Sequence, residues 1–581
     1  MANFPMLSSE PASQRTLSLP ARRVAFAALV IGTTGVLVAQ FVAILAVGGF
    51  GVVEALMVGA FIVKAAWVVI FFWHAMLGFV LLQRAQHPID ALVQEGTLSC
   101  NRVAIAMTAC NEDSAAIVAR LKVMKASLDA TGFGEHFDYF LLSDSSLPEV
   151  IEAEERAAAA WSREAPAGRI VYRRRAATVG FKGGNVREFC GRWGKSYELM
   201  VLLDADSLLT ADAILRLVRI MQVNPRLGIL QSLIVGIRSR SLFARVFEFG
   251  HRHSMRSAMP GAVWWQSERG QYRGHNAAIR VAPFAKACHL AETIEKRGVK
   301  TRGRSHDQLE AALLHAAGFG VRELSHEGGS YEELPPTLLD FTTRYNQWMQ
   351  GNFENLRFLR LPGLTAMDRY HLAAVAHRFL GWPAMVLFVA LVAFKVATWP
   401  SDAPTPAAGS VLALYLTYFG LYFAPRALGM VSAALSDPAA YGGAGRLLLG
   451  GLMDIVLTLL FVPIAMVTAT LFIARLPFSS APNWEAPRRE GYQLHWSDAA
   501  RHLWPQTVIG CALLAFLAAT APHAIPWFLP FVTGLVVAVP FAVITSSPGL
   551  GEWAARHRLC VFPEEVEMPS ELRLFAGALG R

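Results

Sequence analysis

Charged residues are scarce in this sequence. They make up 17% of its 581 residues, whereas apolar residues make up 54%, and the mean hydropathy is +0.37. A soluble domain carries about a quarter charged residues, so this composition excludes a chain that is soluble along its whole length and indicates lipid contact over much of its surface. The length is also too great for one ordinary core, so at least two structural units are expected.

Cysteine is scarce as well, and none of the cysteines forms a CxxC pair. Four of the six lie between residues 99 and 362, where the sequence has the texture of a soluble domain. This pattern excludes a disulfide framework and a zinc site and is typical of reduced thiols in a cytosolic domain. The cysteines are Cys100, Cys110, Cys190, Cys288, Cys511 and Cys560.

The sequence also lacks a basic strip interleaved with aromatic residues, so no nucleic-acid partner is expected despite the net charge of +9. Arginine concentrates where hydrophobic segments end. The positive-inside rule and anionic lipid head groups account for that distribution.

Two long apolar runs lie in residues 21–98, after a polar N-terminal tail of residues 1–20. The run Val24–Val47 follows Arg22 and Arg23 and is too long for a secretory signal, so it predicts a transmembrane helix. A second span is expected over Val53–Leu82, with Lys64 either snorkelling or facing the helix bundle.

A second membrane region is expected over residues 363–550, before a C-terminal tail of residues 551–581. Hydropathy predicts five spans there, or six if residues 425–475 contain a further one, and the side on which the C-terminus lies stays open. An interfacial loop is expected near residues 475–501. The candidate spans are 373–398, 408–424, 447–474, 506–521 and 525–546.

Between the membrane regions, residues 99–362 alternate short apolar runs with helical stretches such as Ser114–Ala130 and Ala211–Val223. This alternation predicts a Rossmann-related α/β domain with a mostly parallel sheet. Ligands bind beyond the carboxyl ends of the strands in such sheets. The expected strands are Val103–Met107, Phe137–Leu142, Arg169–Tyr172 and Leu199–Leu203.

Polar residues follow the expected strands. The first strand runs into Thr108 and then Asn111-Glu112-Asp113, which suits a nucleotide-binding loop or, equally, a helix N-cap. Asp144 follows the second strand and could serve a ligand or a turn.

Asp204 and Asp206 follow the fourth strand. Residues two apart in extended chain point the same way, so their carboxylates can converge. Hard oxygen ligands suit Mg²⁺ or Mn²⁺, with diphosphate oxygens completing the shell. The alternative is a solvated turn, but the position at the end of a buried strand favours the metal.

Further candidates lie on either side of this pair. Lys182-Gly183-Gly184-Asn185 could bring backbone and charge to a phosphate or form a glycine turn into a helix from Val186, and Arg173-Arg174-Arg175 is expected to face solvent. Asp307 could accept a proton, but judged locally the stronger explanation is that Ser305 or Asp307 caps a helix over Gln308–Ala316. Trp348 could form a sugar platform or pack on the membrane.

Together these motifs resemble the membrane-embedded, inverting glycosyltransferases of family two, the cellulose- and hyaluronan-synthase-like group. Within it the chain resembles the branch that makes the backbone of osmoregulated periplasmic glucans. The resemblance covers most of residues 20–560 and rests on Ala106–Thr108, Asn111–Asp113, Leu203–Ser207, Gly274–Ala277, Ser305–Asp307, Gly329–Pro336 and Gly351-Asn352.

The resemblance implies a GT-A-like fold, a polytopic helical membrane domain, and a bacterial inner-membrane enzyme whose catalytic domain is cytosolic. It implies UDP-glucose as donor, a growing β-1,2-glucan as acceptor, Mg²⁺ or Mn²⁺ as cofactor, and periplasmic glucan-processing partners. Asp307 would be the general base, and Asp204 and Asp206 the metal ligands. The nucleotide-sugar site would comprise Thr108, Asn111, Glu112, Asp144, Lys182 and Asp204. The acceptor site would comprise Trp348, His275, Asn276, Glu332 and Arg344.

The sequence departs from the wider group at two motifs. The wider group usually has a QxxRW motif near the end of the domain, and the corresponding residues here are Arg344-Tyr345-Asn346-Gln347-Trp348, so Gln347 replaces the arginine. At the second motif, Ser305-His306-Asp307 replaces the Thr-Glu-Asp of cellulose synthases. No C-terminal cyclic-dinucleotide module is expected. Two alternative functions stay open, namely a lipid-carrier glycosyltransferase of the same fold and a transporter that senses nucleotide.

Overall fold

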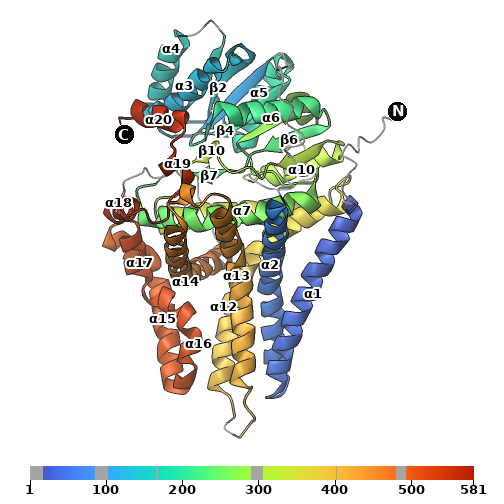
Figure 1. Cartoon of the computed structure of the whole chain (residues 1–581), viewed down its shortest axis with the longest axis vertical. Coiled ribbons are helices and arrows are strands. Elements are labelled where there is room, and N and C mark those ends of the chain that lie inside the picture. The colour runs from blue at the N-terminus through green and yellow to red at the C-terminus, as the bar shows by residue number, and fades with distance from the viewer. Residues whose placement is uncertain are drawn as a thin grey trace.

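The computed structural model describes residues 17–84, 98, 102–164, 166, 168–237, 239–288, 305–400, 402–478 and 492–580. An α/β domain lies at one end of the molecule and a set of long helices at the other. Helix α7 (Leu242–Gln266) lies across the boundary between them (Figure 1). This arrangement confirms the predicted class, an α/β domain joined to a helical membrane region.

A seven-stranded sheet forms the centre of the α/β domain. Its strands are β1 (Val103–Ala109), β2 (Phe137–Ser143), β3 (Ile170–Arg174), β4 (Leu199–Asp204), β6 (Leu227–Gln231), β8 (Ala277–Arg280) and β9 (Gly320–Glu323). Their order is β3-β2-β1-β4-β8-β6-β9. All four expected strands are present and parallel to one another, whereas β8 is antiparallel to both of its neighbours. The sheet is therefore mostly parallel, as predicted, with one reversed strand.

The helices of this domain begin where the sequence offers caps. They are α3 (Ser114–Ala130), α4 (Pro148–Ser162), α5 (Phe181–Trp193), α6 (Ala211–Val223), α8 (Val281–Ala287), α10 (Asp307–Ala316) and α11 (Leu338–Asn355). The Asp113 side chain accepts hydrogen bonds from the first turn of α3, and Thr210 does the same for α6. These bonds satisfy backbone N–H groups that have no partner within the helix.

A second, three-stranded sheet lies beside the end of β4. Its strands are β5 (Leu208–Leu209), β7 (Val235–Gly236) and β10 (Ser330–Glu332). β10 lies in the middle and pairs with both others. Residues that are far apart in sequence thus meet next to the Asp204–Asp206 loop.

Among the described residues, six helices are long and apolar enough to cross a membrane. A further pair, Pro522–Val536 with Ala538–Thr545, passes the same test together but bends by 60°, where hydropathy had suggested one straight span over residues 525–546. The second half of that pair is α17 (Ala538–Thr545), and its first half contains α16 (Ile525–Val536). The six helices are α1 (Leu19–Ala46), α2 (Val52–Gln83), α12 (Ala366–Ala397), α13 (Ala408–Ser436), α14 (Ala444–Arg475) and α15 (Trp496–Thr520).

Three charged side chains in the long helices, Lys64, Glu54 and Lys395, contact protein groups. Lys64 is buried, with its ammonium 4.1 Å from the centre of the Trp382 ring. Glu54 forms an ion pair with Lys395 at 2.5 Å. Of the two positions expected for Lys64, the structure thus shows the one inside the bundle, as the cost of exposing charge to lipid requires.

Two expectations fall mainly or partly outside the described residues. The polar tail of residues 1–20 is described only from residue 17, and the interfacial loop near residues 475–501 is not described over 479–491. The five described cysteines form no disulfide, which fits the expectation of reduced thiols.

The C-terminal segment returns to the α/β domain through α18 (Pro548–Arg556), α19 (Pro563–Val566) and α20 (Ser570–Ala578) (Figure 1). Two buried arginines of α7 hold it. Arg245 makes two hydrogen bonds of 2.7 Å to Glu565, and Arg252 bonds both carboxylate oxygens of Glu564. Such bidentate pairs are strong and fix geometry.

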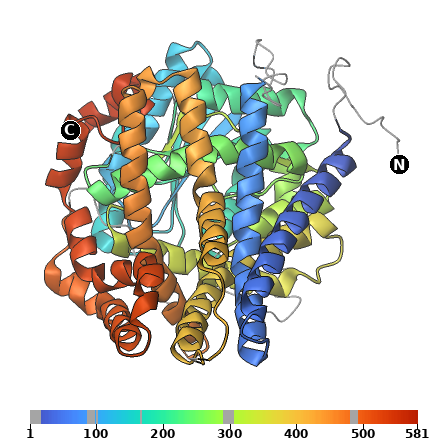
Figure 2. The ribbon, with the colours of Figure 1, turned by 60° about the horizontal axis from the view of Figure 1, so that its bottom comes forward.

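Glycines allow α7 to touch the membrane helices closely, and Figure 2 shows it crossing behind them. A Cβ on Gly78 would lie 1.9 Å from the Ser257 carbonyl oxygen, and one on Gly261 would lie 2.0 Å from the His74 carbonyl oxygen. On α13, a Cβ on Gly429 would lie 1.8 Å from the His253 carbonyl oxygen. Backbones can approach this closely only where both surfaces are small.

We predict that Gly261→Ala destabilises the protein, because its methyl group would meet backbone that cannot rotate away. We expect a loss of about 1–3 kcal/mol, seen as a lower thermal unfolding midpoint of the purified protein in detergent. Gly191→Ala is the matched control, since that helical glycine has open space around its Cβ position. An unchanged midpoint for Gly261→Ala would show that the contact is not tight.

A buried carboxyl connects α7 to the small sheet. Glu248 Oε1 accepts a hydrogen bond of 2.8 Å from the Gly236 N–H, while its Oε2 has no hydrogen-bond partner in the described structure. Burial raises the pKa of Glu248 to about 8, against an ordinary value of 4.5. The folded state therefore holds this proton over a range in which the unfolded chain has lost it.

We predict that the free energy of unfolding falls as pH rises from about 4.5 to about 8 through this group and is insensitive to it above that range. Glu248→Gln keeps the acceptor for Gly236 but cannot ionise, so its unfolding midpoint should decline less across this window. Glu164→Gln, at an exposed position, should decline like the wild type. If the unfolding midpoints of Glu248→Gln and wild type declined equally with pH, the raised pKa would not belong to Glu248.

Candidate functional site

Asp204 and Asp206 lie at the carboxyl edge of the sheet, next to the end of β1. The Thr108 hydroxyl lies 3.2 Å from the Leu203 carbonyl oxygen and 3.4 Å from Asp204 Oδ1. Ser207 Oγ accepts a hydrogen bond from the Asp204 N–H. The strand register thus brings the predicted Thr108 and Asp204 together, and a tight turn follows.

Cationic side chains surround the two aspartates. Lys182 forms an ion pair with Asp204 Oδ1, and Arg344 Nη2 lies 3.4 Å from Asp206 Oδ2. His275 Nε2 lies 3.9 Å from Asp204 Oδ2 and 3.6 Å from Glu332 Oε2. Burial alone would raise the pKa of Asp204, but Lys182 and then His275 outweigh it and hold the pKa at about 2.

Glu112 approaches the same cluster from the loop after β1. Its Oε2 accepts a hydrogen bond of 2.9 Å from the Cys110 N–H. Burial raises the pKa of Glu112 to about 8, and the charges of Asp206 and Asp204 contribute. Asp113 caps the following helix, so the N-cap explanation is confirmed for that residue, and the nucleotide-binding role of Asn111 and Glu112 stays a prediction.

Asn111 connects two loops at this edge. Its backbone has a φ of +63°, and its side-chain oxygen accepts hydrogen bonds from the N–H groups of Ser146 and Leu147. Its own N–H donates to Ser145 Oγ at 2.8 Å. The structure therefore shows Asn111 shaping the edge through its polar atoms.

Asp144 lies in a buried ion pair that the sequence analysis did not predict. Arg175 donates to both of its carboxylate oxygens, at 2.7 and 2.5 Å. Arg173 is buried too and donates to the Asn185 side chain. The expectation that Arg173-Arg174-Arg175 faces solvent is wrong for these two arginines, because the end of β2 and the start of α5 offer buried acceptors.

The glycine turn expected before Val186 lies earlier in the chain. Helix α5 already begins at Phe181, and its N-cap Gly180 has a φ of +73°. Lys182 is therefore in the first turn of a helix. A Cβ on Gly183 would lie 3.2 Å from the His306 ring, so this glycine allows α5 and α10 to approach.

Asp307 is the first residue of α10, and the helix N-cap is His306. Ser305 Oγ donates to Asp307 Oδ1 at 2.9 Å, so neither side chain acts as the expected helix cap. The backbone of Gly274 lies close to both Asp307 and Lys182, since a Cβ there would be 3.6 Å from Asp307 Cβ and 3.9 Å from Lys182 Nζ. The proposed base thus lies beside the Lys182–Asp204 pair.

The His306 side chain turns away from solvent. Its Nδ1 is 2.9 Å from Glu310 Oε2. Burial lowers the pKa of His306, but Glu310 outweighs burial and the net shift is upward. The His306–Glu310 pair thus lies next to Asp307.

The acceptor-side residues lie in different environments. Asn276 is fully buried and donates to Ser330 Oγ, so it holds β10 in place. Glu332 lies near Asp204 and Asp206, with which it forms an acidic cluster, and burial raises its pKa. Trp348 is 52% exposed, one turn after Arg344 on α11, and its ring is open to a ligand or to lipid.

A divalent cation fits the Asp204–Asp206 pair only if other ligands complete its shell. The described residues contain no group of three or more His, Cys, Asp or Glu side chains placed to hold a metal. Two carboxylates leave most of the coordination shell to oxygens of a bound ligand and water, as is usual for Mg²⁺.

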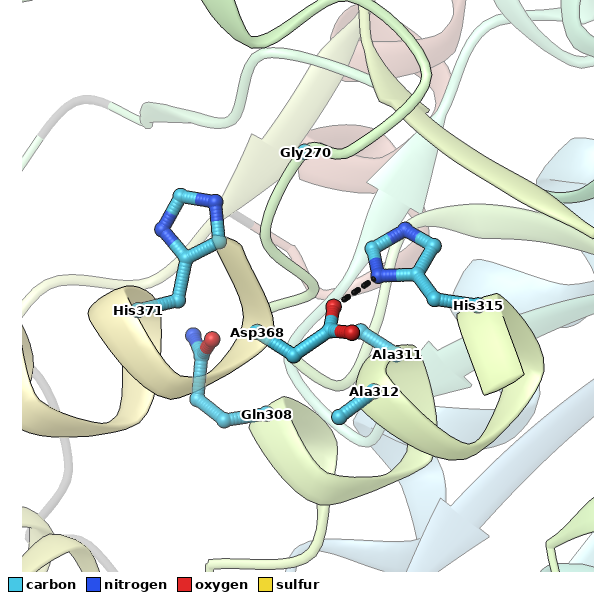
Figure 3. A pocket seen from close by; sticks show the side chains of 7 residues that line it. All are labelled: Gly270, Gln308, Ala311, Ala312, His315, Asp368 and His371. Atoms are coloured by element: carbon cyan, nitrogen blue, oxygen red, sulfur yellow. Dashed lines mark hydrogen bonds and ion pairs between the residues drawn. The ribbon is translucent and has the colours of Figure 1, made fainter. Parts of the chain in front are cut away.

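A narrow pocket lies away from these carboxylates, where α10 meets the start of α12 (Figure 3). His315 Nδ1 lies 2.6 Å from Asp368 Oδ1 across it, and both side chains are buried. None of the predicted site residues lines it. The pocket marks a joint between the α/β domain and the membrane region.

Sequence reasoning missed the contact of Arg175 with Asp144 and the approach of His275 to Asp204. The pairing of Ser143 with Arg174 across β2 and β3 sets Asp144 beside Arg175, and that pairing is known only from the sheet. The approach of His275 to Asp204 and Glu332 depends on the reversed β8 and on β10, for which no local pattern exists.

Comparisons with known proteins agree with this architecture. The model of glycosyl transferase family group 2 matches residues 199–473. A protein named glucans biosynthesis glucosyltransferase H from Ralstonia nicotianae is 34% identical over 581 residues, covering 95% of this chain and 66% of that protein. Its namesake from Pseudomonas aeruginosa is also 34% identical, covering 88% of this chain and 62% of that protein. The chain thus spans slightly less than two thirds of the length of these relatives.

Among solved structures, a mannosyltransferase from Pyrobaculum calidifontis in complex with GDP-Man and Mn²⁺ has a TM-score of 0.36 and 17% identity, covering 66% of this chain and 99% of that one. The family match begins at β4, the strand that carries Asp204, and extends through α14. Residues 199–473 therefore contain a domain that matches glycosyl transferase family group 2.

Proposed function

We propose that the chain is a membrane-embedded glucosyltransferase that polymerises glucose from UDP-glucose into the β-1,2-glucan backbone of periplasmic glucans. The observation that carries this proposal is the convergence of Asp204, Asp206, Lys182 and Asp307 at one edge of the sheet, above the long apolar helices. The family match over residues 199–473 and the names of the relatives support the class of reaction and product.

The transfer would be a single displacement with inversion. Asp307 takes the proton from the acceptor hydroxyl as that oxygen attacks the anomeric carbon, and UDP leaves from the opposite face. Ser305 holds one oxygen of Asp307 at 2.9 Å and so orients the carboxylate.

The leaving diphosphate gathers negative charge, which cationic groups must offset. Lys182 and Arg344 flank Asp204 and Asp206 and are placed to contact phosphate oxygens. Mg²⁺ or Mn²⁺ bound by Asp204 and Asp206 would supply further charge neutralisation. Arg344 stands one helical turn before Gln347, so it can provide the guanidinium that the QxxRW motif places at the later position.

The acceptor would enter along α11. Trp348 offers an exposed aromatic face, and sugar C–H faces pack well on such rings. We place the catalytic domain on the cytosolic side of the bacterial inner membrane, with the helices guiding the glucan outward to periplasmic processing partners.

The test is incubation of the purified full chain with UDP-[¹⁴C]glucose and Mn²⁺ or Mg²⁺. We expect UDP release and a soluble β-1,2-glucan by size and linkage analysis. A labelled glycolipid would favour the lipid-carrier alternative, and absence of UDP release would reject the proposal.

We predict that Asp307→Asn lowers UDP release at least about a hundredfold, because a general base contributes roughly 10²–10⁴ in rate. UDP-glucose should still bind, since the side chain keeps its shape. Asp206→Asn should lose activity through weaker metal and donor binding. Asp212→Asn, at an exposed position on α6, is the control. Full activity of either site variant would reject its assigned role.

A further inference from the structure

The C-terminal helix α20 packs against α3 and the start of α6. These helices flank the Asp204-Ala205-Asp206 loop, the proposed metal loop. Helix α20 lies along α3 (Figure 1). Glu571 accepts a hydrogen bond of 3.1 Å from the Ala211 N–H, at the start of α6, as well as one from the Ser127 hydroxyl. Phe575 belongs to the core of the α/β domain. A segment more than 360 residues later in the chain therefore forms part of the support beneath Asp204 and Asp206.

Arg120 is the point where this support reaches the metal loop. It comes from α3 and is 3% exposed. Its Nη1 donates a 3.0 Å hydrogen bond to the carbonyl oxygen of Ala205, the residue between the two aspartates. Its Nη2 forms an ion pair with Glu333, which follows Glu332. One guanidinium thus joins the metal loop to the end of β10.

Phe575 covers the other side of this guanidinium. The ring centre lies 4.6 Å from Arg120 Cζ, within the range of a cation–π contact. The ring limits the rotation of the side chain and excludes water from it. Because Arg120 is planar and bonded at both ends, its position fixes the orientation of the Ala205 peptide.

The orientation of that peptide matters because the carboxylates on either side must converge on one ion. A rotation of the Ala205 peptide would turn Asp206 relative to Asp204. We propose that Arg120 is a positioning residue for the Asp204-Ala205-Asp206 loop, and that helix α20 holds it in place through Phe575. The inference rests on the proposed metal-binding role of the two aspartates.

The experiment measures Mn²⁺ binding directly, by the loss of the free Mn²⁺ signal in electron paramagnetic resonance, with full-length protein and UDP. Arg120→Gln removes the charge and one of the two bonds, and we expect its Mn²⁺ affinity to fall at least about fivefold. Arg120→Lys keeps the charge but lacks the two donor groups of the guanidinium, so its Mn²⁺ affinity should lie between those of wild type and Arg120→Gln. Lys122→Gln is the matched control, because Lys122 forms an exposed ion pair on the same helix.

Phe575 gives a second, independent arm. Phe575→Leu keeps an apolar side chain but removes the aromatic face, and it should weaken Mn²⁺ binding in the same direction by a smaller factor. Leu574→Ala, on the exposed side of α20, should match the wild type. Should Arg120→Gln fail to fold, Glu333→Gln and Phe575→Leu decide the question.

The outcomes separate the two levels of inference. Wild-type protein that binds no Mn²⁺ in the presence of UDP would reject the proposed metal function itself. Wild type that binds Mn²⁺, together with folded Arg120→Gln or Glu333→Gln that binds it within about twofold of wild type, would overturn the positioning role alone. Excess Mn²⁺ should restore UDP release by Arg120→Gln but not by Asp307→Asn, as expected if only the metal loop is displaced.

Discussion

The close contact of helix α7 with the membrane helices is the constraint on which the rest of the structure depends. Gly78, Gly261 and Gly429 remove the side chains that would hold the backbones apart. Once α7 is fixed, its other face determines the position of the α/β domain. Glu248 bonds the N–H of Gly236 in β7, and β7 pairs with β10, which carries Glu332. Helix α7 and the small sheet of β7 and β10 thus connect the membrane helices to the acidic cluster.

Helix α12 contacts the two elements that carry the proposed base and the proposed sugar platform. The buried His315–Asp368 pair joins it to α10, whose first residue is Asp307 (Figure 3). The Trp382 indole donates to the Tyr345 hydroxyl at 2.7 Å and so joins α12 to α11, the helix of Arg344 and Trp348. If the glucan passes along the membrane helices as proposed, the proton acceptor and the sugar platform are anchored to the path itself. A fixed distance between them suits repeated additions of the same unit.

The parts of the site that sequence could predict obey local rules. A buried strand ending in Asp204-Ala205-Asp206 places its carboxylates at the sheet edge whatever follows, and the same rule located Thr108 and Asp144. Burial of Arg173 and Arg175 could not be read from the run itself, because it depends on which strand becomes the neighbour of β3. The contact of Arg120 with Ala205 joins residues 85 apart in sequence, and its cover comes from Phe575. Such long-range contacts leave no periodic signal, and the reversal of β8 belongs to the same class.

The charges of the described site explain why donor and metal should bind together. Asp204 and Asp206 are each paired with a cationic side chain, Lys182 or Arg344. A metal ion alone would meet these cations and be repelled by them, and a diphosphate alone would meet the carboxylates of Asp204 and Asp206. When both arrive, Lys182 and Arg344 can turn to phosphate oxygens while the carboxylates keep the metal. Each ion pair within the protein is then replaced by contacts between its two side chains and ligand charges of opposite sign, so no buried charge is left without a partner. A cluster that is balanced before the ligands bind would also be balanced after UDP departs, which suits the repeated transfer step of the proposed function.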